Sequence, residues 1–218
     1  VIAECQTEGK GRRGRKWESP FGSHLYVSRY FQSTDGLAAA AGLSLAIGIA
    51  VKNAVQKFID APVLLKWPND LLVDNKKLAG ILVEAEGQSD GICHLVIGIG
   101  INVSMPVGSG QQIDQPWTDI EQYSDLTIDR NKLCIDLIKE LDQIMAEYQN
   151  HRLEKLYGIW NQYNAYKDKK VDVIGTTQKL TGICMGIDQS GALIIIDKKT
   201  NTPTKVHGGE ISLRQSKI

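Results

Sequence analysis

Residues 37–58 read LAAAAGLSLAIGIAVKNAVQKF, and this apolar stretch decides the fold class. Its larger apolar side chains recur at helical spacing, at Leu43, Ile47, Val51, Val55 and Phe58. That spacing predicts a helix with one buried face. Because its other residues are mostly alanine and glycine, we expect it to pack closely against a sheet. Glycine and serine interrupt the apolar run, and its continuous apolar part, residues 37–51, is too short for a membrane span.

Short apolar segments bounded by turn residues surround this helix. They predict strands at residues 24–31, 63–66, 71–73, 78–84 and 92–101, with a hairpin turn at 74–77. A second long helix is expected over residues 130–149, with Asp129 as its N-cap, and a third over residues 153–163. Residues 104–117 have no periodic pattern and predict a lid or binding loop.

The last fifty residues have a different pattern. Five short segments from residue 171 onward alternate with glycine-rich turns, which predicts a small β-barrel. We therefore expect an α/β (α+β) chain with two domains, residues 1–165 and residues 166–218.

Composition limits the classes of function. The chain has 218 residues and a net charge of zero, so a polyanionic partner must meet a local basic patch. The four cysteines form no Cys-x-x-Cys pair, which argues against a zinc or redox site and fits a reducing cytosol. No histidine lies in a recognisable nucleophile motif. The chain begins at Val1 within an apparent strand, so we expect it to be a fragment lacking its natural N-terminus.

Residues 9–17, GKGRRGRKW, contain five cations and three glycines. Glycines destabilise helices and strand interiors, so this segment predicts a loop. Exposed backbone N–H groups and cations together can hold an anion. A solvated basic turn or a nucleic-acid contact are alternative readings.

Other polar residues lie at the ends of apolar strands: Arg12, Lys66, Asn69, Asp70, Lys77 and Asn102. If they converge, they make a cationic site suited to binding and activating a phosphorylated substrate. Alternatively, the lysines are solvated hairpin residues and the Asn69–Asp70 pair simply forms a turn after Pro68.

Four motifs occur in the order seen in biotin protein ligases: GKGRRGR at residues 9–15, KWPND at 66–70, KLAGILVE at 77–84 and GIGINV at 98–103. The segment GGEISLR at 208–214 resembles the end of bacterial members. The resemblance covers nearly the whole chain. It implies an SH2-like ligase domain with a mixed sheet, followed by an SH3-like β-barrel.

The resemblance also implies a two-step reaction. Biotin and MgATP form biotinyl-5′-AMP and pyrophosphate, and a lysine of a biotin carboxyl carrier protein then attacks the anhydride. ATP and Mg²⁺ are the implied cofactors, and the cytoplasm is the implied location. A homodimer is possible. DNA binding and a repressor role would need a domain upstream of Val1, as would the family's Ser-Thr-Asn segment that helps to bind biotin.

Site residues follow from the matching motifs. Arg12 and Lys77 are the expected catalytic residues. The expected biotin pocket comprises Gln6, Gly9, Lys10, Arg12, Tyr26, Lys77, Gly80 and Leu82. The expected ATP and adenylate contacts are Arg12, Lys66, Asn69, Asn102, Trp117 and Arg214, and Asp70 is a weaker candidate for a metal ligand. Lys10 replaces the arginine usual in the family and so lacks the bidentate fork.

Two rival functions remain open at this stage. A lipoate–protein ligase shares the fold and the adenylate chemistry, although the basic loop and the KWPND motif favour biotin. A nucleic-acid-binding module would use the basic loop as its footprint. If the ligase reading is right, residues 9–16 should be mobile without ligand and should lie on the same face as Lys77 and Asn102.

Overall fold

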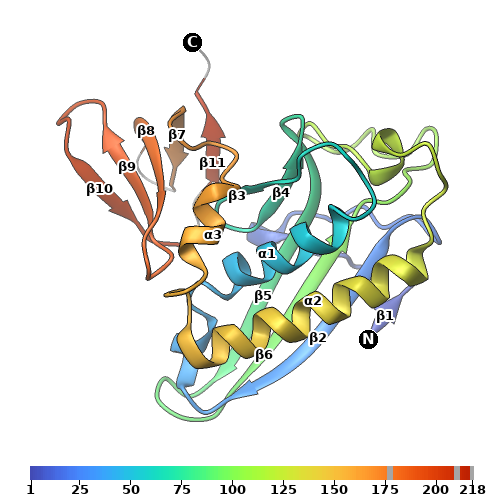
Figure 1. The fold of residues 1–218 in the computed structure, drawn as a ribbon, viewed down its shortest axis with the longest axis horizontal. Coiled ribbons are helices and arrows are strands. Elements are labelled where there is room, and N and C mark those ends of the chain that lie inside the picture. The colour runs from blue at the N-terminus through green and yellow to red at the C-terminus, as the bar shows by residue number, and fades with distance from the viewer. Residues whose placement is uncertain (176–178, 209–211, 217–218) are drawn as a thin grey trace.

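The computed structural model describes residues 1–175, 179–208 and 212–216, which form two antiparallel sheets and the helices that cover the larger one (Figure 1). The larger sheet has the order β1-β2-β6-β5-β4-β3 and the smaller one the order β10-β9-β8-β7-β11. The α+β class expected from the sequence is therefore confirmed.

The strands of the larger sheet are β1 (Ile2–Ala3), β2 (Leu25–Ser33), β3 (Leu64–Lys66), β4 (Asp70–Val73), β5 (Lys76–Gly87) and β6 (Cys93–Ile101). Within the described residues, every pair of named strands is antiparallel, so the expected mixed sheet is corrected. Parallel pairing occurs there only as isolated bridges, such as the one between Lys77 and Trp117.

The apolar stretch that decides the fold is not one continuous helix. A 3₁₀ helix, Gly36–Ala40, precedes α1 (Leu43–Val55), and Gly42 separates them with a φ of 75°. Only glycine adopts this φ without strain, and a Cβ on Gly42 would lie 2.2 Å from Leu153. The prediction of a helix over residues 37–58 was therefore too long at both ends.

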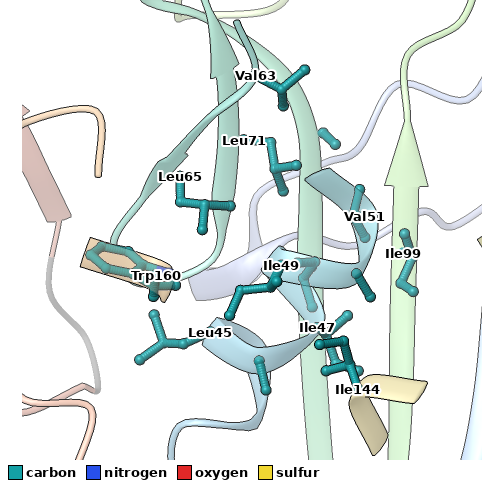
Figure 2. Packing of buried hydrophobic residues seen from close by; sticks show 14 of the residues in the cluster. Leu45, Ile47, Ile49, Val51, Val63, Leu65, Leu71, Ile99, Ile144 and Trp160 are labelled. Carbon is teal, nitrogen blue, oxygen red and sulfur yellow. The ribbon is translucent and has the colours of Figure 1, made fainter. Parts of the chain in front are cut away.

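Helix α1 lies in the centre of the core (Figure 2). Its Leu45, Ile47, Ile49 and Val51 are at most 3% exposed. Residues 36–55 are long and apolar enough to cross a membrane by length and composition, but 67% of that window is buried inside the structure. This is the pattern of a core helix.

Helix α2 (Arg130–His151) lies alongside α1 on the same side of the sheet (Figure 1). The Asp129 carboxylate accepts hydrogen bonds from the backbone N–H groups of Asn131 and Lys132, which confirms the predicted N-cap. Helix α3 (Tyr157–Gln162) is shorter than expected. Because both long helices cover one face of the sheet, the opposite face of β2, β6 and β5 is left open to form a site.

The smaller sheet consists of β7 (Lys170–Ile174), β8 (Lys179–Ile187), β9 (Leu193–Asp197), β10 (Pro203–Val206) and β11 (Ser212–Gln215). The five predicted strands are found in the described residues, although residue 211, where the fifth was expected to begin, lies outside them. The described strands do not close into a barrel, because β10 and β11 are the two edges. The buried Trp67 indole donates a hydrogen bond to the Gly191 carbonyl at 3.1 Å and ties this sheet to the larger one. The domain boundary after residue 165 stays a prediction.

His24, just before β2, makes the stability of the fold depend on pH. Its side chain is fully buried, and burial lowers its pKa from 6.5 to about 4, although Asp119 acts in the opposite direction. Neutral His24 therefore contributes its full stability above about pH 6.5, and this contribution is lost as the pH falls toward 4. The total is about 3 kcal/mol at 1.36 kcal/mol per pKa unit.

We predict that between pH 7 and pH 4.5 the unfolding free energy of the wild type falls by about 2–3 kcal/mol more than that of His24→Asn, which has no titrating group at this position. Urea denaturation at a series of pH values measures the difference. Parallel pH profiles for the two proteins would contradict the assignment.

Candidate active site

Three charged side chains meet at the ends of adjacent strands β3, β4 and β5. The two carboxylate oxygens of Asp70 contact the Lys77 ammonium at 2.7 Å and the Lys66 ammonium at 3.1 Å. All three side chains are at most 16% exposed. Burial alone raises the pKa of Asp70, but the two lysines outweigh it and hold that pKa below its usual value. Asp70 is therefore a buried anion between two cations.

A β-bulge lets Lys77 take part in this cluster. The register of β4 against β5 pairs Leu71 with Ala79 but Leu72 with Lys77, so that one residue of β5 is left over. Side chains normally alternate between the faces of a strand. The extra residue allows Lys77 to reach the face of Asp70 and Gly80, although three positions separate Lys77 from Gly80.

The basic loop reaches the same cluster through Arg12. Its guanidinium donates a hydrogen bond to the side-chain oxygen of Asn69 at 3.2 Å, and the Asn69 amide in turn donates to the Ile81 carbonyl at 2.7 Å. Burial lowers the pKa of the Arg12 guanidinium below its usual value, although the nearby Asp70 carboxylate acts in the opposite direction. Asn69 thus connects the loop to the strands that carry Asp70 and Lys77.

Trp17, at the end of the basic loop, covers a floor of glycines on the open face of the sheet. Gly80 and Gly100 are paired across β5 and β6. A Cβ on Gly100 would lie 2.7 Å from the indole ring, and one on Gly80 would lie 3.0 Å from it. The Lys77 ammonium lies 5.2 Å from the centre of the indole ring. The glycines therefore make room for the flat Trp17 indole directly beside Lys77.

These groups line one cavity of about 580 Å³. Seven cationic side chains contribute to its walls: Lys10, Arg12, Arg13, Arg15, Lys16, Lys66 and Lys77. Residues 112–115 of the predicted lid loop lie on the same cavity. Of the residues expected from the sequence, the structure brings together here Gln6, Lys10, Arg12, Lys66, Asn69, Asp70, Lys77, Gly80 and Leu82.

Five expected site residues do not line this cavity. The Gly9 carbonyl accepts a hydrogen bond from the backbone N–H of Trp17, which closes the basic loop. The Tyr26 hydroxyl donates a hydrogen bond to the Pro20 carbonyl. Asn102 is 5% exposed and donates to the Thr118 carbonyl. Trp117 is half-buried and forms a bridge with Lys77. Arg214 is exposed, and its neighbour Leu213 lines the cavity instead.

Sequence reasoning assigned no role to several cavity residues. Trp17 was the most important of these, and an aromatic residue next to a cationic glycine loop was the available signal. Glu84 lies on the wall as well, and it belongs to the KLAGILVE motif. Leu213 comes from the second sheet, and only the tertiary structure shows that it reaches this site.

The expected metal ligand does not fit the structure. Both Asp70 oxygens are paired with lysines, and the described residues contain no cluster of three or more His, Cys, Asp or Glu side chains able to hold a metal ion. Mg²⁺ is commonly bound through substrate phosphates with few protein ligands. We therefore assign no chemical step to a protein-bound metal.

The glycine floor gives a direct test of where Trp17 lies. Gly100→Ala should displace the indole, because the new methyl group would lie 2.7 Å from it. Gly98→Ala is the matched control, since its Cβ would have only ordinary contacts, the nearest at 3.6 Å. We predict that the NMR indole N–H resonance of Trp17 shifts strongly in Gly100→Ala and little in Gly98→Ala. Equal shifts in the two variants would contradict this packing.

Comparison with known proteins agrees with this geometry. The profile of the biotin/lipoate A/B protein ligase family matches residues 1–102. The bifunctional ligase/repressor BirA of Salmonella typhimurium is 40% identical over 215 residues, which are 99% of this chain and 66% of that protein. A biotin–[acetyl-CoA-carboxylase] ligase of Mycobacterium tuberculosis is 32% identical over 200 residues, 89% of this chain and 72% of that protein.

The chain thus spans about two thirds of the length of the BirA relative. Among solved structures, a biotin protein ligase from Aquifex aeolicus in complex with biotin and ATP matches with a TM-score of 0.83 and 28% identity. That match covers 99% of this chain and 88% of the Aquifex chain. The sequence relatives, the shared fold and the ordered motifs show that this chain belongs to the biotin protein ligase family.

Proposed function

We propose that this chain carries the catalytic site of an ATP-dependent biotin–[acetyl-CoA-carboxylase] ligase. In the first step a carboxylate oxygen of biotin attacks the α-phosphorus of MgATP, giving biotinyl-5′-AMP and pyrophosphate. In the second step the amine of an acceptor lysine attacks the carbonyl carbon of the anhydride and AMP leaves. The nucleophiles belong to the substrates, so the protein needs to supply positioning and charge stabilisation.

One observation carries the proposal: Lys77, Lys66 and Arg12 surround Asp70 and Asn69 at the wall of a cavity that also has a glycine floor. An apolar ring system with a carboxylate tail suits such a site, because the Trp17 indole that lies on the glycine floor offers a flat apolar wall. The adjacent cations neutralise the tail and the phosphates. Lys77 lies beside both the floor and Asp70, and we assign it to the reacting carboxylate.

The remaining roles follow from position. Arg12 and Lys66 stabilise the phosphates and the adenylate, and the basic loop closes over the product to keep water away from the anhydride. Gln6, Lys10 and Leu82 line the cavity, and we assign them to biotin. Asn102 acts indirectly by fixing the backbone next to Lys77. Trp117 and Arg214 remain proposed adenylate contacts that would require movement on binding.

The partner we propose is a biotin carboxyl carrier domain that supplies the acceptor lysine. The four cysteines are free, which fits a reducing compartment, and we place the reaction in the cytoplasm. Self-association through sheet edges stays a prediction, as does mobility of residues 9–16. The repressor role named for the Salmonella protein belongs to that relative and forms no part of this proposal.

The direct test is transfer of labelled biotin or labelled lipoate to a carboxyl carrier domain by the full-length protein with MgATP. The proposal predicts that biotin alone becomes protein-bound. Transfer of lipoate in place of biotin would assign the chain to the rival ligase. Absence of transfer, together with tight nucleic-acid binding that weakens steeply with salt, would support the nucleic-acid reading instead.

Lys77→Ala should lower biotin-dependent pyrophosphate release at least about 100-fold, the usual effect of removing a group that stabilises developing charge. Lys76→Ala is the matched control, because Lys76 is exposed and does not line the cavity. Near-normal pyrophosphate release from Lys77→Ala in the full-length protein would remove Lys77 from its proposed role.

Arg12→Ala should loosen the bound adenylate. We expect biotinyl-5′-AMP to dissociate about tenfold faster or more, which corresponds to roughly 1.4 kcal/mol of lost binding. Arg12→Lys should have an intermediate effect, because it keeps the charge but loses the planar fork. Stopped-flow release of the preformed adenylate measures these rates, and unchanged release from Arg12→Ala would refute the assignment.

A further inference from the structure

The lid loop, residues 104–117, is held at both of its ends. At the far end, the Lys77 backbone N–H donates to the Pro116 carbonyl, and the Lys77 carbonyl accepts from Thr118, both at 2.9 Å. At the near end, the backbone N–H groups of residues 103–105, which lead into the loop, each have a separate acceptor. Ser104 donates to the Ser23 carbonyl at 3.0 Å and Met105 to the Asp119 carboxylate at 2.9 Å.

The third acceptor at the near end is a side-chain nitrogen. The backbone N–H of Val103 donates to Nδ1 of His24 at 3.1 Å. Nδ1 also lies 3.0 Å from the Ser23 carbonyl, and only one of these two contacts can be a hydrogen bond in a given tautomer. The backbone N–H of Val103 is always a donor. Nδ1 must therefore be the acceptor, with the ring proton on Nε2.

This tautomer gives the backbone N–H of Val103 an acceptor, and it places the ring proton on Nε2. The Ser23 carbonyl already accepts from Ser104, so it does not need the histidine. Nε2 of His24 is buried and has no hydrogen-bond partner among the described residues. A buried polar atom without a partner is unfavourable. His24 is therefore placed in the core for its acceptor atom, at the point where the lid loop leaves β6.

We propose that His24 is a positioning residue for the lid loop, which it holds against the nucleotide side of the cavity by accepting the Val103 backbone N–H. The proposal rests on the ligase function proposed above. Residues 112–115 of the loop line the cavity, and Trp117 bridges to Lys77. Holding both ends of the loop keeps residues 112–115 at the cavity before ATP binds, which lowers the entropic cost of binding.

Three substitutions at His24 distinguish the effect of losing the hydrogen-bond acceptor from the effect of changing the size of the side chain. His24→Asn places an amide oxygen close to the Nδ1 position, whereas His24→Gln places it further out, and His24→Leu has no acceptor. We expect His24→Asn to keep a KM for ATP within about twofold of the wild type. His24→Gln and His24→Leu should raise that KM about tenfold, with the KM for biotin changed less than about twofold.

A second measurement does not depend on activity. Hydrogen exchange followed by mass spectrometry should show faster exchange at residues 103–117 in His24→Gln and His24→Leu, and wild-type exchange in His24→Asn. Tyr148→Phe is the control for general destabilisation, because it removes buried hydrogen bonds to the Ala39 and Ala41 carbonyls on the far side of the core. It should leave both the loop exchange and the KM for ATP unchanged.

The outcomes are decisive in either direction. Equal effects of His24→Asn and His24→Gln on the KM for ATP and on loop exchange would overturn the proposal, as would a tenfold change in Tyr148→Phe. If His24→Leu does not fold, the Asn and Gln pair still decides. If the wild type shows no biotin-dependent activity, the ligase function fails, while the exchange data still test whether His24 fixes the loop.

Discussion

The carboxylate of Asp70 holds together the three strand ends on which the site is built. It contacts Lys66 on β3 and Lys77 on β5, while Asp70 itself belongs to β4. Removing three charges from water is unfavourable, and the mutual attraction offsets this only when the geometry is good and all partners are present. Removal of Asp70 would leave two neighbouring cations without a counter-charge. The ion pairs therefore position the lysines more than they stabilise the fold.

The arrangement also shows how a neutral chain could hold the anionic substrates proposed above. Net charge is zero, so attraction must come from the local concentration of cations around the cavity. The basic loop supplies most of them, and Arg12 is tied to the strands through Asn69. The glycine floor makes room for the Trp17 indole next to Lys77, and residues 112–115 of the lid loop line the same cavity. In the proposed function, recognition of the substrate ring and activation of its carboxylate would both depend on residues of β5.

Much of this could be predicted from the sequence, for identifiable reasons. Apolar periodicity located the long helices, and turn residues located the five short strands. The strand-end positions and the motifs of Arg12, Lys66, Asn69, Asp70 and Lys77 marked them as candidate site residues, and the structure brings them together. Other features depend on long-range packing. The bulge that brings Lys77 to the face of Asp70 leaves no local signal, and the break at Gly42 depends on contact with Leu153. Asn102, expected among the adenylate contacts, does not line the cavity, and its amide donates to the Lys77 and Thr118 carbonyls.

The most direct test of the account is a double-mutant cycle on Asp70 and Lys77. Asp70→Asn, Lys77→Met and the double variant are compared with the wild type by urea unfolding at neutral pH. Asp70→Asn leaves the buried Lys77 ammonium without its counter-charge, and Lys77→Met removes the nearer of the two lysines that pair with Asp70. We predict a coupling free energy of about 2 kcal/mol, within the range measured for interacting buried groups. A coupling below about 0.5 kcal/mol, the value for independent sites, would contradict it.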